Sequence, residues 1–331
     1  GRAPQVRLAL FQVADDTYDY LHHFNLAAQD GWSYQIMVTA LLDAYQSCLS
    51  GREPVALPPS ATFGDFCVEQ DRRDETEAAR FWQRELAGVP FPPPSITLPP
   101  SRRTAGAQPQ LLQETARVTQ ESTRALAELA RGHGLSVNTL LHGAWALMLS
   151  AITGSREVVC GAIFSGRGTT SVDIDQAVGL LFNILPVATT VDPAERLLPW
   201  LAVLQEKNSA ITDHEYVSQA TLHELAGAPV DSPLVESYVV SENLPGVVSN
   251  LGRFFSVLGA MPTQFLAQTE HPLRVELAVS DEFVLITLNH RAGWFPEGAV
   301  GRWVAAYVAL LDAMIADPRR PLGELLPDLT D

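Results

Sequence analysis

Two adjacent histidines are the first residues whose chemistry suggests a site. His22 and His23 lie in a stretch that predicts a strand from about Tyr18 to Ala27, and paired imidazoles can bind a metal ion or exchange protons. Neighbouring residues of a strand point to opposite faces of the sheet. We therefore expect two half-exposed strand histidines that do not serve one site together.

Two other polar groups follow predicted strands. Asp30-Gly31-Trp32-Ser33 ends the extended pattern, and Ser165-Gly166-Arg167 follows a buried strand over Glu157–Phe164. An arginine next to glycine at a strand end can hold a distant carboxylate, or can lie in an ordinary surface turn. Asp30 can supply that carboxylate, or can be an acidic residue stabilised by the first-turn amides of a helix.

Several common catalytic motifs are missing from the sequence. It contains no H-E-x-x-H, G-x-S-x-G, Walker A or G-x-G-x-x-G pattern, so zincin, hydrolase, P-loop and Rossmann functions lack support. The cysteines Cys48, Cys67 and Cys160 are scattered and have no C-x-x-C spacing for zinc or redox chemistry. We expect no metal site and no bound cofactor.

Composition narrows the class of protein. The 331 residues are 47% hydrophobic and carry a formal net charge of -16, which excludes a largely disordered chain and argues against nucleic-acid binding. The longest uncharged apolar stretch, around Gly143–Ile152, is shorter than the roughly 20 residues that span a bilayer. No signal-peptide pattern opens the chain. These features predict a soluble, cytoplasmic protein that binds neither nucleic acid nor membrane.

The hydrophobic periodicity predicts an α/β architecture in which strands alternate with helices. A proline-rich connector over residues 90–110 separates the predicted parts, residues 1–89 and residues 111–331. Strands are expected at Arg7–Val13, Tyr18–Ala27, Glu157–Phe164, Val235–Ser241, Arg253–Leu258, Leu273–Val279 and Phe283–Asn289. Helices are expected near Ile36–Cys48, Glu75–Leu86, Ser122–Arg131, Ser136–Ile152, Pro199–Ile211, Gln219–Leu225 and Pro296–Ile315.

The order of many short motifs resembles one family. The motifs are Arg7-Leu-Ala-Leu-Phe11, Asp30-Gly-Trp-Ser33, Phe81-Trp-Gln-Arg-Glu-Leu-Ala-Gly88, Val137-Asn-Thr-Leu140, Ser165-Gly-Arg167, Val178-Gly-Leu-Leu-Phe-Asn-Ile-Leu-Pro186, Ser241-Glu-Asn-Leu-Pro245 and Asp317-Pro-Arg-Arg-Pro321. Together they resemble condensation domains of nonribosomal peptide synthetases, which have the chloramphenicol-acetyltransferase-like fold. The resemblance implies two lobes, each a mixed sheet with flanking helices, and an incomplete N-terminal lobe, because the family has a longer front part.

The resemblance also implies partners, substrates and site residues. Carrier proteins would bring a donor thioester and an acceptor amine on phosphopantetheine arms into a tunnel between the lobes, as in the secondary metabolism that such synthetases carry out. Asp30 would pair with Arg167 across the lobes. Gly31 would contribute backbone to the reaction centre and Asn183 would lie near it, whereas Trp32, Ser33 and Ser165 would line or support the tunnel.

The motif that carries the family's histidine is altered. The family pattern is H-H-x-x-x-D-G, and an alignment without gaps places Asn25 and Leu26 at the two histidine positions. Leu26 cannot accept a proton, so this alignment implies a degenerate active site. The alternative alignment keeps His22-His23 as the motif, with His23 catalytic and a longer loop before Asp30.

Three functions follow from these alignments. The first is a condensation-type acyltransferase that forms an amide bond, or a variant of it, from carrier-bound thioesters. The second is a non-catalytic platform that docks carrier proteins or neighbouring synthetase domains, or recruits a tailoring enzyme. The third is a free-standing acyltransferase with a soluble acceptor.

Overall fold

The chain divides into two compact units. The computed structural model describes residues 5–55, 61–103, 110–168, 174–229, 232–242 and 271–329. Of these, unit 1 contains the residues up to Arg73 and those within Ser165–Phe182, and unit 2 contains the rest. The strand expected at Arg253–Leu258 lies outside the described residues.

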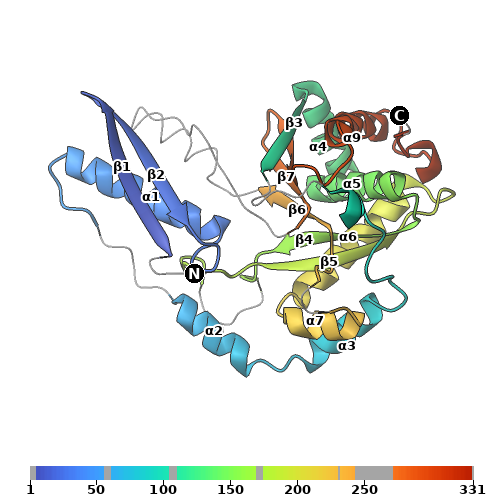
Figure 1. Ribbon diagram of the computed structural model, residues 1–331, viewed down its shortest axis with the longest axis horizontal. Helices are drawn as coiled ribbons and strands as arrows, with labels where there is room; N and C mark the ends of the chain where they lie inside the picture. Colours follow the sequence, from blue (N-terminus) through green and yellow to red (C-terminus); the bar gives the residue numbers. More distant parts are fainter. Residues whose placement is uncertain are drawn as a thin grey trace. The chain divides into compact units, whose positions relative to one another are not determined.

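Unit 1 contains an antiparallel hairpin and two helices (Figure 1). Strands β1 (Val6–Ala14) and β2 (Thr17–Phe24) pair so that Leu8 lies opposite His22. They are followed by helices α1 (Gly31–Leu49) and α2 (Phe63–Arg72). The second strand ends earlier than predicted, because Asn25 begins a turn in which its carbonyl oxygen accepts a hydrogen bond from the Ala28 amide at 2.8 Å.

A small apolar cluster stabilises unit 1. It contains the buried Ile174, Ala177 and Leu181, which belong to the 165–182 segment, and the partly buried Phe63 and Phe66 of α2. The rings of Phe63 and Phe66 stack with their centroids 6.1 Å apart. Helix α2 was not predicted. Its apolar residues are partly buried or exposed and its mean composition is polar, so the sequence lacks the strongly apolar run that marks a core helix.

Unit 2 is built on a mixed six-stranded sheet of order β3-β8-β7-β6-β4-β5. The β4–β6 and β6–β7 pairs are parallel and the other pairs are antiparallel. The strands are β3 (Leu111–Val118), β4 (Glu157–Phe164), β5 (Asn183–Thr190), β6 (Ser237–Glu242), β7 (Leu273–Val279) and β8 (Val284–Arg291). The two edge strands, β3 and β5, were not predicted; β5 tolerates Pro186 because an edge strand needs fewer amide donors.

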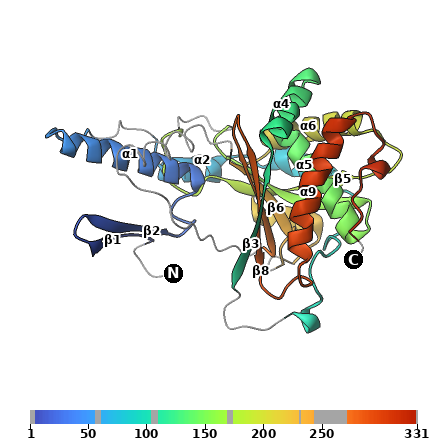
Figure 2. The same cartoon turned by 90° about the horizontal axis from the view of Figure 1, so that it is seen from above.

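The helices of unit 2 flank this sheet, and Figure 2 shows α9 running beside β3 and β8. They are α3 (Thr76–Glu85), α4 (Gln120–Gly132), α5 (Val137–Thr153), α6 (Leu197–Asp213), α7 (Gln219–Ala226) and α9 (Ala299–Ala316). Helix α5 begins after the predicted N-cap Ser136, whose side chain accepts from the Thr139 amide, and ends at the left-handed Gly154.

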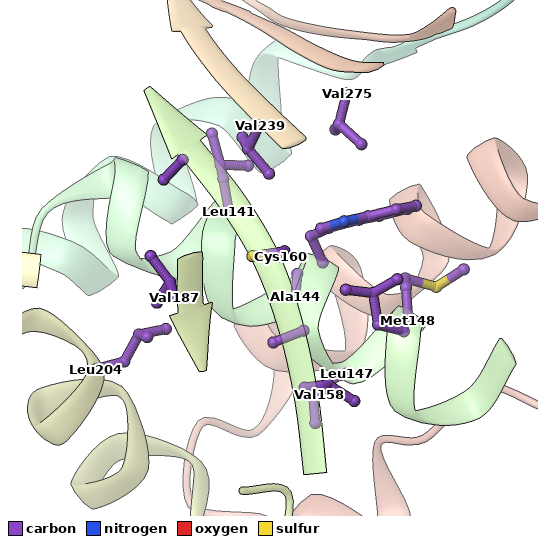
Figure 3. Close-up of a cluster of buried hydrophobic side chains, with 14 of the residues drawn as sticks. Leu141, Ala144, Leu147, Met148, Val158, Cys160, Val187, Leu204, Val239 and Val275 are labelled. Atoms are coloured by element: carbon purple, nitrogen blue, oxygen red, sulfur yellow. The ribbon is translucent and has the colours of Figure 1, made fainter. Parts of the chain in front are cut away.

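The core of unit 2 forms where α5 packs on the strands (Figure 3). Side chains of α5 interleave there with those of β4, β5, β6, β7 and α6, including Leu141, Ala144, Leu147, Met148, Val158, Cys160, Val187, Leu204, Val239 and Val275.

Among the described helices, α9 alone is long and apolar enough to span a membrane unaided, and the bent pair α4–α5 passes the same test jointly. Eight side chains of α9 are buried, so its apolar face belongs to this core.

Candidate active site

Asp30 organises the start of α1. The residue is 2% exposed and is the N-cap of the helix. Its Oδ1 accepts from the Ser33 amide at 2.7 Å, and its Oδ2 accepts from the Leu181 amide at 3.2 Å. Its own amide donates to the Gly179 carbonyl at 3.0 Å. One carboxylate therefore caps a helix and binds a segment that lies about 150 residues later in the chain.

Ser33 strengthens the same connection. Its side chain is fully buried, and its Oγ lies 2.6 Å from Asp30 Oδ1 and 2.9 Å from the Gly179 carbonyl oxygen. The Gly179 amide donates to that Oγ at 3.0 Å. Ser33 was expected to line or support a tunnel; its hydroxyl is engaged by groups of the protein.

Arg167 lies beside the Asp30 carboxylate. Its Nη2 is 3.6 Å from Asp30 Oδ1, with side-chain exposures of 6% and 3%. The guanidinium also donates to the carbonyl oxygens of Ile174 and Ala177. Burial lowers the pKa of Arg167, and the charge of Asp30 opposes that shift. Both residues of the pair belong to unit 1, so the interaction expected across two lobes lies within one compact unit.

Trp32 and Gly166 complete this cluster. The Trp32 indole donates to the Asp175 carbonyl at 3.0 Å, and the Arg167 guanidinium lies 5.5 Å from the centroid of its ring. Gly166 has φ of +69°, and a Cβ there would lie 1.9 Å from the Leu181 carbonyl oxygen. Ser165 is exposed, and its Oγ accepts from the Arg167 amide at 3.3 Å. Position 166 requires glycine, because both its positive φ and the nearby Leu181 carbonyl oxygen exclude a side chain.

The two residues at the histidine positions of the gap-free alignment lie in the turn after β2. Asn25 and Leu26 are exposed, Leu26 to 44%. The Asn25 Oδ1 accepts from the Ala27 amide at 2.9 Å, which closes an Asx turn. The turn holds the residues that separate the His22-His23 pair from Asp30. His22 is half-buried and His23 exposed, as expected for opposite faces of a strand.

Asn183 has a well-defined environment in unit 2. Its amide nitrogen donates to the carbonyls of Glu215 and Val217, at 3.2 and 2.9 Å. Its Oδ1 accepts from Gln219 Nε2 at 2.6 Å, and Gln219 also donates to the Ile184 carbonyl. Asn183 therefore fastens the start of β5 to the segment between α6 and α7.

Sequence reasoning missed several contributors to these networks. Gly179 and Leu181 act through their backbone groups, which leave no side-chain signal, and Gln219 was assigned only to a helix. In the described part of the chain, no group of three His, Cys, Asp or Glu residues is placed to hold a metal ion.

Comparisons with known proteins agree with this architecture. The family model for the condensation domain matches residues 1–330. A linear gramicidin synthase protein of Brevibacillus parabrevis is 30% identical over 98% of this chain, and chondramide synthase cmdD of Chondromyces crocatus is 29% identical over 99%. The chain spans only 4% and 8% of these two relatives.

Solved structures show the same fold at lower sequence identity. A four-domain nonribosomal peptide synthetase bound to AMP and glycine superposes with a TM-score of 0.80 at 18% identity, over 99% of this chain and 26% of that one. The X-domain from teicoplanin biosynthesis gives a TM-score of 0.78 at 19% identity, over 98% of this chain and 75% of that one. The predicted fold class is confirmed, and this chain belongs to the condensation domain family.

Proposed function

We propose that this chain is the condensation domain of a nonribosomal peptide synthetase and joins two carrier-bound substrates through an amide bond. The donor would be a thioester on one phosphopantetheine arm and the acceptor an amine on another. The observation that carries this proposal is the family match across residues 1–330, together with the intact network between Asp30, Ser33 and Arg167.

The network supports a catalytic domain because it fixes the start of α1. Asp30, Ser33 and Gly179 hold the N-terminus of α1 against the 165–182 segment through buried hydrogen bonds. Gly31, which follows the N-cap, is exposed, and apart from its chain neighbours and its own helix no atom lies within 4 Å of the position a Cβ would take. The Gly31 backbone is therefore open on that side, which suits the backbone role that the family resemblance implies for it.

Positioning supplies the larger part of the expected rate enhancement. An α-amino group has a reference pKa of about 7.7–8.0, so a useful fraction is unprotonated near neutrality. Holding donor and acceptor together contributes about 7–11 kcal/mol, whereas a general base contributes roughly 3–5 kcal/mol, or about 10²–10⁴-fold. A domain with Leu26 at the usual histidine position would therefore keep the larger contribution to lowering the activation free energy, which comes from positioning.

Carrier proteins are the partners that this function requires, and neighbouring synthetase domains or a tailoring enzyme are further partners. One solved neighbour is an X-domain in complex with OxyB, with a TM-score of 0.76 at 20% identity. We expect no resident cofactor, because the phosphopantetheine arms belong to the carriers, and we place the domain in the cytoplasm.

The test is a two-carrier transfer assay. The full chain is mixed with a donor carrier loaded with one aminoacyl group and an acceptor carrier loaded with another, and each carrier is followed by intact mass spectrometry. Condensation transfers the donor acyl mass to the acceptor carrier and frees the donor thiol. Carrier binding without transfer would indicate the non-catalytic platform, and transfer only to a soluble amine would indicate the free-standing acyltransferase.

A further inference from the structure

The buried imidazole of His223 lies between two backbone carbonyl groups. His223 belongs to the last turn of α7 and is 8% exposed. Its Nδ1 lies 2.7 Å from the carbonyl oxygen of Gln219, one turn earlier in the same helix, and its Nε2 lies 2.9 Å from the carbonyl oxygen of Ser232. Both ring nitrogens are therefore within hydrogen-bond distance of an oxygen that can only accept.

These two acceptors decide which form of the His223 ring fits the site. A neutral imidazole has a proton on one nitrogen and a lone pair on the other, so either tautomer turns its lone pair toward a carbonyl oxygen. The imidazolium carries an N–H group on both nitrogens and donates to both oxygens. Because a buried polar group without a partner is costly, the geometry favours the protonated ring.

The charged groups around α7 come from three places. The charged side chains of α7 itself and of α3, which packs on it, are Glu224, Glu75, Glu77, Arg80, Arg84 and Glu85. The segment before β6 adds Glu236, whose carboxylate accepts from the Ile96 amide, and the segment after α6 adds His214 and Glu215. Carboxylates and arginines ordinarily keep their charge between about pH 5 and 8, whereas histidine changes its charge there. Within this set, proton exchange near neutrality therefore falls to His223 and His214.

His214 provides a comparison in the same part of unit 2. Its Nδ1 lies 2.8 Å from the Ala210 carbonyl oxygen, and its ring stacks on Phe81 of α3 with 4.2 Å between the ring centroids. A neutral ring with its proton on Nδ1 satisfies that carbonyl contact. The second carbonyl acceptor therefore distinguishes His223 from His214.

The two contacts of His223 join segments that are separated along the chain. Ser232 lies in a turn before β6, where its amide and its Oγ both donate to the Pro229 carbonyl. Gln219 begins α7, and its side chain donates to Asn183 Oδ1 and to the Ile184 carbonyl of β5. The imidazole therefore connects the turn before β6 to the helix that is bound to the start of β5, all within unit 2.

We propose that His223 is a pH-sensitive clasp of unit 2, closed when the ring carries both protons and opened when one proton leaves. In the closed state the ring donates to the Gln219 and Ser232 carbonyls at once. Loss of a proton turns a lone pair toward one of these oxygens, so that contact is lost and the turn before β6 is held to α7 less firmly. The inference concerns the fold of unit 2 and holds whatever reaction the domain catalyses.

The direction of the effect follows from proton linkage. The folded state offers two acceptors to the protonated ring, whereas water solvates the ring in the unfolded chain. The clasp therefore stabilises unit 2 most at acid pH, and this contribution is lost as the pH rises and the ring gives up its proton. Because histidine exchanges protons between about pH 5 and 8, we expect the clasp to open within that range.

The first test uses the unmodified full chain labelled with ¹⁵N-histidine. We expect the His223 signals to show protons on both ring nitrogens at about pH 5.5 and on one at about pH 8.5. The amides of Ala228 and Ser232 report on the turn, because they donate to the carbonyls of His223 and Pro229. Their hydrogen-exchange protection, corrected for the intrinsic effect of pH, should fall roughly tenfold over the same range, as expected for one hydrogen bond lost at a buried group. A ring with a single proton at the acid end, or protection that stays constant, would overturn the proposal.

The second test compares substitutions at the two histidines. His223→Gln keeps a polar side chain that cannot take up a proton, so we expect the pH dependence of exchange at Ala228 and Ser232 to disappear. The matched control His214→Gln removes a ring whose carbonyl contact needs no second proton, and its pH dependence should match wild type. Persistence of the pH dependence in His223→Gln, or its loss in His214→Gln alone, would assign the effect to another group and refute the clasp.

Discussion

The Oγ atom of Ser33 lies 2.6 Å from Oδ1 of Asp30, and both residues are buried in unit 1. Because Ser33 also contacts both backbone polar groups of Gly179, this short contact connects the cap of α1 to the 165–182 segment. Asp30, which the sequence offered either as a carboxylate partner for Arg167 or as a helix-terminal acid, serves in both ways at once.

Replacing Asp30 should destabilise unit 1 strongly. In Asp30→Ala, the buried Arg167 loses its ion-pair partner, and the amides of Ser33 and Leu181 lose their acceptor. Truncating one partner of a buried pair costs about 3–5 kcal/mol, measurable by urea unfolding. The matched control is Asp19→Ala on the exposed hairpin, which we expect to stay within about 0.5 kcal/mol of wild type. Equal effects of the two variants would contradict the network.

Alanine variants at Gly166 and Gly51 distinguish the stability cost of a positive φ from the additional cost of a steric clash. Both have positive φ, +69° and +66°, but a Cβ at Gly166 would meet the Leu181 carbonyl oxygen at 1.9 Å, whereas nothing lies within 4 Å of one at Gly51. We expect Gly51→Ala to cost about 1 kcal/mol and Gly166→Ala to cost at least twice as much. Thermal unfolding of both variants measures the difference, and a smaller loss in Gly166→Ala would show that the close approach is wrong.

Removing the Asn183 side chain should destabilise unit 2 and increase local opening near β5. The Asn183→Ala variant removes the amide that donates to the carbonyls of Glu215 and Val217, and it removes one of the two acceptors of Gln219 Nε2. Lost hydrogen bonds of partly buried groups cost about 1–3 kcal/mol in total stability. Hydrogen exchange should show faster opening of the segment between α6 and α7. In contrast, Asn25→Ala removes only an exposed turn contact, and exchange in that α6–α7 segment should stay at the wild-type rate.

Part of this arrangement could be predicted from the sequence. Helix α5 was placed by Ser136 and Gly154, whose cap signals are local, and β4 by its continuous apolar run. Strands β3 and β5 were missed because they lie at sheet edges, where burial imposes a weaker pattern. The partners of Asn183 lie about 32–36 residues further along the chain and act largely through backbone carbonyls, so no residue-type pattern marks them.

Acid should destabilise the protein through the histidines whose pKa is lowered by burial. Burial lowers the pKa of His142 to about 4, and its Nε2 lies 3.4 Å from Ser241 Oγ. The unfolded state then binds more protons than the folded state between about pH 6.5 and 4, so stability falls as the pH falls through that window. Burial also lowers the pKa of His22 and His290, so their titration changes stability in the same direction.

The contribution of His142 is isolated by substitution. His142→Gln removes the titrating ring, so the difference in melting temperature between pH 7.5 and pH 5 should shrink relative to wild type. The exposed His133→Gln serves as control and should leave that difference unchanged. A pH dependence that is identical in all three proteins would show that His142 titrates normally in the folded state.

The central claim is that this domain transfers an acyl group from one carrier to an amine on another. It is tested most directly by intact mass spectrometry of loaded donor and acceptor carriers with and without the full chain. We expect the acceptor carrier to gain the donor acyl mass as a hydroxylamine-resistant amide, with the donor thiol released, at a rate proportional to enzyme concentration. Carriers that keep their own acyl groups at every enzyme concentration would contradict the account.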